Sequence, residues 1–154
     1  MTLPTPRLEL AFSIEANVGE PLDLGIVRHE RRRIVPILGG TFAGPGIQGR
    51  VLPGGADWQL LQDDGGAVLD ARYTLETEGG ALIYVVNRGL RYGTPEVLRK
   101  LNAGEPVDPA SYYFRSAPAF ETSAAEWAWL MRFLFVGYGE RYPDQVKLHF
   151  FKVL

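Results

Sequence analysis

Several charged, amide and phenol side chains stand beside aromatic or apolar residues, which is where a ligand pocket would need them. Asp57 follows a double glycine and precedes Trp58, and Asn87 ends a strongly apolar run. An arginine at such a place can bind a carboxylate or a carbonyl, and a carboxyl group whose pKa is raised by burial can act as a general acid or base. The candidates of this kind are Asp57, Trp58, Asn87, Arg88, Tyr113, Arg115 and Glu121.

The segment from Val68 to Thr77 alternates charged with apolar residues, which is typical of a half-buried strand. Asp70 and Arg72 share one face, and Leu69 and Tyr73 share the other. In the simpler interpretation the charged face lies in water. In the other, Asp70 and Arg72 face a polar lumen as a hydrogen-bonded pair, because a buried charge needs a partner.

The basic run from Arg28 to Arg33 also has two interpretations. The simpler one is a solvated loop between strands. The other is a contact with an anion or a phosphate, which requires these arginines to converge at the mouth of a pocket.

Two common catalytic patterns are not expected here. The run from Gly44 to Gly49 matches G-x-G-x-x-G by letters, but Arg50 to Gly54 reads as a strand and a turn, not as the helix that holds a pyrophosphate. A bend where strands cross closely explains these glycines better. The sequence shows no G-x-S-x-G elbow and no recognisable serine–histidine pairing, so a serine hydrolase of that type is not expected.

Short apolar segments separated by glycines predict an antiparallel β architecture. Asp64-Gly65-Gly66 and Glu78-Gly79-Gly80 are typical of hairpin turns, because glycine tolerates the positive φ angles that these turns need. The expected strands are Arg7 to Ala16, Leu22 to Val27, Arg33 to Thr41, Ile47 to Leu52, Trp58 to Leu61, Val68 to Thr77, Leu82 to Asn87, Tyr112 to Arg115, Phe133 to Tyr138 and Val146 to Val153.

Two short helices are expected among the strands. Thr94-Pro95-Glu96 supplies an N-cap, a proline at the first helical position and an acid in the first turn, and Asn102 to Gly104 ends this helix. A second helix is predicted to start at Ser123, with Glu126 three residues later as a capping box.

The regular spacing of these strands predicts a mainly β chain that forms one domain, residues 1–154, closed as an antiparallel barrel with one or two short helices. Both faces of the segment from Ala81 to Val86 are apolar. One of these faces must be covered by something other than the barrel core. The helices or a second copy of the chain could cover it, so a homodimer is one expectation.

Composition narrows the class of protein. The chain has no cysteine and two histidines, so we expect no metal site and no cofactor. Its 16 basic and 18 acidic side chains do not favour nucleic acid as a partner. The sequence shows neither a secretory signal nor the run of about 20 apolar residues that a membrane-spanning helix needs. The expected location is therefore the cytoplasm, without membrane contact.

The combination of Pro-Gly-Gly-Ala-Asp-Trp, at residues 53–58, with Leu-Asp-Ala-Arg-Tyr, at residues 69–73, resembles the bacterial and fungal family called domain of unknown function 3237. The resemblance covers the chain from about Leu8 to Val153. It implies a calycin-like barrel, similar in outline to the lipocalins, and it implies no particular activity. Its motif positions fall on Asp57, Trp58, Asp70, Arg72, Tyr73, Asn87, Arg88, Arg115 and Glu121.

Three functions are weighed on this basis. The leading hypothesis is a binding protein that holds a small, mostly apolar metabolite inside the barrel, with contacts from Trp58, Asp70, Arg72, Tyr73, Asn87, Arg88, Tyr113 and Arg115. The second is a cofactor-independent isomerase, cyclase or lyase, with Asp57 or Glu121 as the general acid or base. The third is a structural or protein-interaction barrel without a pocket.

Overall fold

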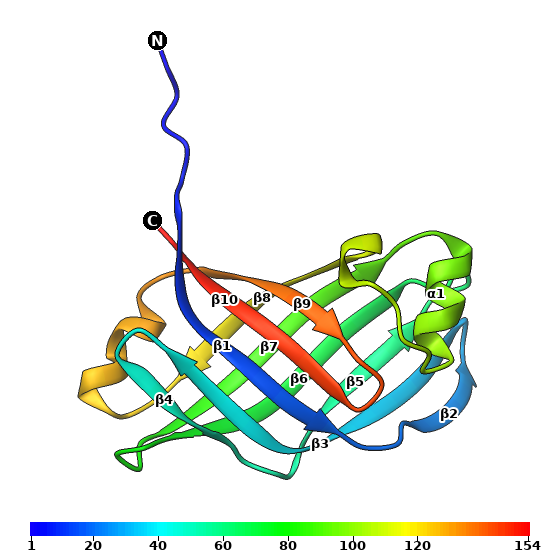
Figure 1. Cartoon of the computed structure of the whole chain (residues 1–154), viewed down its shortest axis with the longest axis horizontal. Coiled ribbons are helices and arrows are strands. Elements are labelled where there is room, and N and C mark those ends of the chain that lie inside the picture. Colours follow the sequence, from blue (N-terminus) through cyan, green and yellow to red (C-terminus); the bar gives the residue numbers. More distant parts are fainter.

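The computed structural model describes residues 1–154 and forms one antiparallel sheet that closes on itself (Figure 1). The predicted closed barrel is therefore confirmed. Its strands are β1 (Leu8–Val18), β2 (Leu22–Val27), β3 (Glu30–Gly44), β4 (Ile47–Val51), β5 (Gly55–Leu61), β6 (Ala67–Thr77), β7 (Leu82–Tyr92), β8 (Tyr113–Glu121), β9 (Phe135–Arg141) and β10 (Gln145–Val153).

The barrel has eight positions around its circumference, because β4 and β5 occupy one position between β3 and β6. Closure is made by β1, which pairs with β10 on one side and with β3 on the other. At this seam the backbones approach so closely that a Cβ atom on Gly44 would overlap the carbonyl oxygen of Ala11. The predicted crossing of strands at this glycine is thus confirmed, and the segment after it is a strand, β4.

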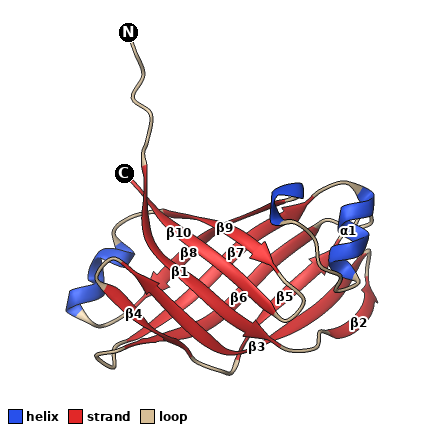
Figure 2. Cartoon of the chain, in the orientation of Figure 1, coloured by secondary structure: helices blue, strands red, loops and turns tan.

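Helical turns lie at the two ends of the barrel, whereas the strands form its wall (Figure 2). Helix α1 (Pro95–Asn102) begins as predicted, since the side chain of Thr94 accepts a hydrogen bond from the backbone N–H of Val97. The 3₁₀ turn η1 (Pro109–Ser111) was not predicted.

The second predicted helix is a 3₁₀ segment, η2 (Ala125–Met131), and its predicted cap is wrong. Ala124 occupies the N-cap position and makes no side-chain cap bond. The hydroxyl of Thr122, not that of Ser123, accepts the backbone N–H of Ala124.

Strand β8 runs to Glu121, well beyond the predicted end at Arg115. The sequence argues against this because Pro118 lies within it and lacks the N–H that a central strand uses. The structure accommodates Pro118 because β8 pairs with β9 only at Arg115 and Ser116. Beyond those residues β8 pairs with β7, whose paired residues run from Tyr84 to Tyr92.

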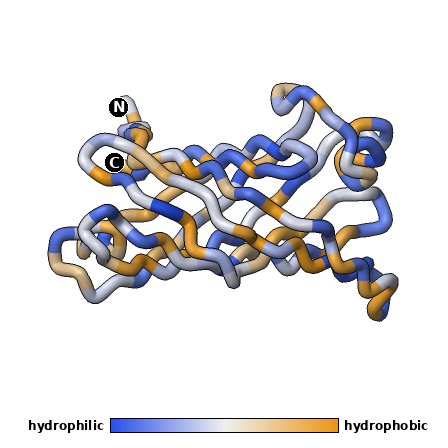
Figure 3. Tube along the Cα trace, turned by 60° about the horizontal axis from the view of Figure 1, so that its bottom comes forward, coloured by the Kyte–Doolittle hydropathy of each residue, from blue (hydrophilic) through white to orange (hydrophobic).

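The two halves of the barrel interior are filled differently. Near η2 the interior is packed with aromatic rings: Phe12 lies 5.5 Å from Phe42, 5.7 Å from Phe120 and 5.5 Å from Phe150, centroid to centroid. Polar and apolar residues alternate along the strands (Figure 3), as a barrel with a buried inner face requires. The half that faces α1 contains a cavity.

No helix of the chain is long and apolar enough to cross a membrane.

Candidate functional site

The cavity has a volume of about 1150 Å³ and opens at the α1 end of the barrel. Exposed residues of the loops after β1, β5, α1 and β9 form its mouth; among them are Glu20, Asp63, Gly104 and Asp144. Apolar side chains of the strands, such as Val35, Ile37, Leu69 and Phe114, form much of its wall. An interior with this much space does not fit the packed barrel that a purely structural role predicts.

One side of the cavity wall is polar. The polar residues come from four consecutive positions of the sheet and alternate with outward-facing neighbours, so period-two geometry directs them inward. They are Asp57 and Gln59 on β5, Tyr73 on β6, Asn87 and Arg91 on β7, and Ser116 on β8.

Five of these side chains have a buried polar atom without a hydrogen-bond partner. The atoms are Gln59 Oε1, Tyr73 Oη, Asn87 Oδ1, Arg91 Nε and Ser116 Oγ. Buried polar groups in proteins are nearly always hydrogen-bonded, because leaving one unsatisfied costs about 1–3 kcal/mol. Five such atoms around one cavity are what a site for a polar ligand or for bound water requires.

Asp57 is the acid of this polar wall. Its Oδ2 accepts a hydrogen bond from Gln59 Nε2 at 2.9 Å, and its Oδ1 accepts the backbone N–H of Asp70 at 3.0 Å. Burial nevertheless raises the pKa of the Asp57 carboxyl, because loss of water outweighs these hydrogen bonds and the positive charge of Arg91. A carboxyl group tuned in this way can hold a proton or transfer one within the cavity.

The phenol of Tyr73 lies in the same part of the wall. Burial, and then the negative charge of Asp57, raises the pKa of Tyr73, so its hydroxyl stays protonated at physiological pH. Its unpartnered Oη is therefore a hydrogen-bond donor for anything that occupies the cavity.

Arg91 connects the polar wall to the mouth. Burial lowers the pKa of Arg91 to about 10, so the guanidinium keeps its charge at neutral pH. It donates to Asn102 Oδ1 at 3.3 Å, and Asn102 Nδ2 in turn donates to the carbonyl oxygen of Gly65 at 3.1 Å. Asn102, the last residue of α1, thereby ties the helix to both the barrel wall and the β5–β6 turn.

The structure places three of the sequence candidates in the cavity: Asp57, Tyr73 and Asn87. Trp58, Asp70 and Arg88 lie instead around a shallower pocket of about 440 Å³ on the outer face of the barrel. Arg72 is also on the outer face, where its Nε lies 3.2 Å from Asp70 Oδ1. The charged face of β6 is therefore the outward one, as the simpler interpretation of that strand expects.

The remaining candidates, on β8, also point away from the cavity. Tyr113 and Glu121 are exposed, and the guanidinium of Arg115 lies 4.0 Å from the ring centroid of Tyr138. Inward positions of this strand are held by Phe114 and Ser116. The alternation within β8 was readable, but the sequence does not say which of its two faces is inside.

Sequence reasoning missed Gln59, Arg91 and Ser116. A usable signal existed for two of them, since Gln59 is two residues from Asp57 and Arg91 is four residues from Asn87, which puts each pair on one face. Arg141 at the mouth was missed as well, whereas Arg33 lies in the basic run for which an anion contact was one interpretation.

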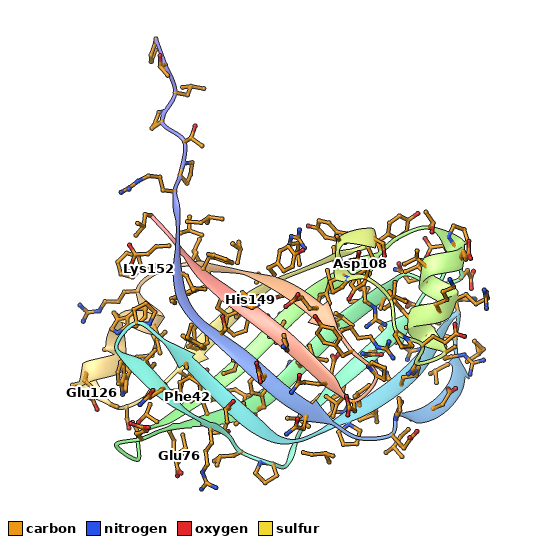
Figure 4. The ribbon with its side chains drawn as sticks, viewed as in Figure 1. Phe42, Glu76, Asp108, Glu126, His149 and Lys152 are labelled. Atoms are coloured by element: carbon orange, nitrogen blue, oxygen red, sulfur yellow. The ribbon has the colours of Figure 1, made fainter.

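The structure also contains a serine–histidine pair that the sequence did not reveal. Ser13 Oγ lies 2.7 Å from His149 Nδ1, and His149 Nε2 lies 2.9 Å from Glu140 Oε2. The three residues alternate with inward-facing neighbours on β1, β10 and β9, so they lie on the outer face of the barrel; His149 is labelled in Figure 4. They are not part of the cavity wall.

The chain is similar in sequence and in structure to several known proteins. A UPF0311 protein of Rhodopseudomonas palustris is 46% identical over 151 residues, which cover 98% of this chain and 99% of the relative. A crystal structure of a conserved R. palustris protein of unknown function matches with a TM-score of 0.94 at 45% identity, over 99% of this chain and 100% of that one. A crystal structure from Acinetobacter baumannii, described as a beta-barrel like protein, matches with a TM-score of 0.86 at 38% identity, over 99% of each chain.

The family model described as protein of unknown function (DUF3237) matches residues 6–153, so the resemblance inferred from the two sequence motifs is confirmed. The chain belongs to the DUF3237 family.

Proposed function

We propose that this protein binds a small organic molecule inside the barrel, with its polar groups against the wall formed by Asp57, Tyr73, Asn87 and Ser116. The observation that carries the proposal is the set of five buried, unpartnered polar atoms on the wall of an open cavity. These atoms have no partner within the protein, so a ligand with matching donors and acceptors can pair with them.

The size and wall of the cavity support the same proposal. Pockets for small molecules are usually about 300–1,000 Å³, and this cavity, at about 1150 Å³ including its mouth, is large enough for such a ligand. The apolar residues opposite the polar wall suit the body of a metabolite, and the polar groups would fix its orientation.

A variant that fills the cavity tests this directly. Ala71 lines the cavity, so Ala71→Phe would occupy ligand space, whereas the matched variant Ala119→Phe adds the same ring to an exposed position of β8. A library of metabolites is screened by thermal unfolding of the wild-type protein, because a ligand that binds only the folded state raises Tm. We expect hits that stabilise the wild type and Ala119→Phe but not Ala71→Phe. Hits that stabilise all three proteins equally would place binding outside the barrel.

A second candidate function is acid–base catalysis on the bound molecule, as in a cofactor-independent isomerase, cyclase or lyase. The specific support is Asp57, a carboxyl group with a raised pKa that faces the cavity near the protonated phenol of Tyr73.

The variant Asp57→Asn separates the two functions. Each compound found in the library screen is incubated with the wild type or with the variant, and mass spectrometry then shows whether the compound has been converted. If the protein is an enzyme, the wild type converts the compound, and Asp57→Asn binds it with similar affinity but converts it far more slowly. If the protein is a carrier, the compound is recovered unchanged from both proteins.

A further inference from the structure

Three arginines gather at the α1 end of the cavity. Arg33 comes from β3, Arg91 from β7 and Arg141 from the end of β9, and all three line the cavity. Their hydrogen bonds go to uncharged oxygens. Arg33 Nη1 donates to Asn102 O at 3.2 Å, Arg91 Nη2 donates to Asn102 Oδ1 at 3.3 Å, and Arg141 Nη1 donates to Glu105 O at 2.8 Å.

None of these arginines has a carboxylate within ion-pair distance. The ion pairs of the chain lie elsewhere; the one at the mouth joins Arg31 to Asp23 at 2.8 Å. Burial is the largest cause that lowers the pKa of Arg91; the charge of Asp57 raises it, and the charges of Arg141 and Arg33 each lower it, so the three guanidinium groups act on one another. Arg91 is the most buried of the three, and its Nε has no hydrogen-bond partner.

The carboxylates near the cavity do not balance this cluster. Asp57 is the acid on the inner wall, and it lies beyond ion-pair distance of Arg91. Burial lowers the pKa of Arg33 and the charge of Asp23 partly opposes this, but Asp23 is exposed and is already paired with Arg31 at 2.8 Å. Glu20, Asp63 and Asp144 are exposed at the mouth, where water screens their charge. A buried guanidinium without a carboxylate partner is unfavourable, so the arginine cluster favours an anionic ligand.

We propose that the ligand of the cavity is an organic acid whose carboxylate is held by Arg33, Arg91 and Arg141, with the rest of the molecule extending along the wall toward Tyr73 and Ser116. This inference rests on the proposed function. Guanidinium groups match carboxylates because their N–H donors form parallel, charge-assisted hydrogen bonds. Arg33 belongs to the basic run for which an anion contact was one interpretation. Of the arginines of that run, Arg31 and Arg33 line the cavity and Arg28 and Arg32 do not, so the run converges there only in part.

Two acid–amide pairs test the inference: 2-naphthoate with 2-naphthamide, and laurate with lauramide. Binding is measured by titration calorimetry for the wild type, Arg33→Gln and Arg141→Gln. Arg50→Gln is the matched control, because Arg50 is exposed on β4 and pairs with Glu76 outside the cavity. We expect the wild type and Arg50→Gln to bind at least one acid tenfold or more tighter than its amide. Arg33→Gln and Arg141→Gln should lose most of that preference while binding the amide as before.

Equal affinity for acid and amide, or an acid preference that survives both substitutions, overturns the inference and leaves the proposed function standing. If all four compounds fail to bind the wild type, the inference is overturned for aromatic and linear acids alike, and the library screen decides separately whether the cavity binds anything.

Thermal unfolding without ligand distinguishes a binding role from a structural one. If the arginines only cap α1, Arg33→Gln and Arg141→Gln should lower Tm and leave the acid preference unchanged, which overturns the inference. If they form an anion site, removing one of three repelling charges should leave Tm unchanged or raise it while the affinity for the acid falls, which supports the inference.

Discussion

Asp57 illustrates at the scale of one residue how a site can oppose stability. Its carboxyl is kept from water on the barrel wall, and this raises its pKa above the ordinary value of 3.8. The folded protein therefore binds this proton more tightly than the unfolded chain does. Between the ordinary and the raised pKa, stability falls as pH rises, because the unfolded chain gives up the proton first.

Asp57→Asn should remove this pH dependence. Relative to the wild type, the variant should gain free energy of unfolding as pH rises from about 4 toward neutrality, since the amide stays uncharged throughout. Urea unfolding of both proteins across this range measures the difference, in which the other titrating groups cancel. A difference that stays constant with pH, or that shrinks as pH rises, would show that the carboxyl is not perturbed in the direction described.

Residue types in the sequence identified Asp57, Tyr73 and Asn87 but equally favoured Arg72, Arg88 and Arg115, which lie outside the cavity. The reason is physical. Alternation tells which residues of a strand share a face, but when both faces carry polar and apolar side chains it does not tell which face is enclosed.

Strand β6 shows the same limit at the scale of an element, because its two faces differ in function although both carry polar groups. Tyr73 faces the cavity with an unpartnered hydroxyl, and Arg72 forms an ion pair on the outer face. Helix α1, by contrast, could be predicted from Thr94, Pro95 and Glu96, because capping and first-turn preferences are local. The full length of β8 could not be predicted, because Pro118 is acceptable only beyond the residues at which β9 pairs with β8.

Tyr73→Phe and Arg72→Gln should therefore have different effects. Loss of the Tyr73 hydroxyl should weaken ligand binding several-fold, because it removes a donor from the polar wall, and should not destabilise the free protein. Loss of the Arg72 ion pair should change stability little, as is usual for pairs at the protein surface, and should leave affinity unchanged. Calorimetry with a compound found in the library screen measures the affinity of each variant, and urea unfolding measures its stability. A loss of affinity in Arg72→Gln alone would place the binding surface on the outer face.

At the scale of the whole molecule the decisive feature is closure between β1 and β3, strands that are joined through the edge strand β2 (Figure 1). Gly44 permits this approach, because a side chain there would meet the backbone of Ala11 and Phe12. The sequence indicated many strands and turns. Closure was predicted from the regular spacing of the hairpins and supported by the family resemblance, but the strands that meet at the seam were not, since period-two patterns do not describe the pairing of distant strands. A homodimer and a cytoplasmic location stay predictions.

Gly44→Ala should destabilise the barrel by several kcal/mol, because rigid backbone atoms cannot move aside without opening the seam; overpacking typically costs about 1–3 kcal/mol, occasionally more. Gly79→Ala is the control, since a Cβ atom there has Thr77 Oγ1 at 3.9 Å as its nearest neighbour. Urea unfolding compares the two variants with the wild type. Equal stability of Gly44→Ala and Gly79→Ala would contradict the tight β1–β3 approach.

Native mass spectrometry of freshly purified protein, with identification of any retained compound, tests most directly whether the cavity is a binding site. We expect a non-covalent adduct with a small organic acid on the 17.1 kDa chain, present in the wild type and absent from Ala71→Phe. Bare polypeptide in repeated preparations, even after incubation with metabolite mixtures, would contradict it.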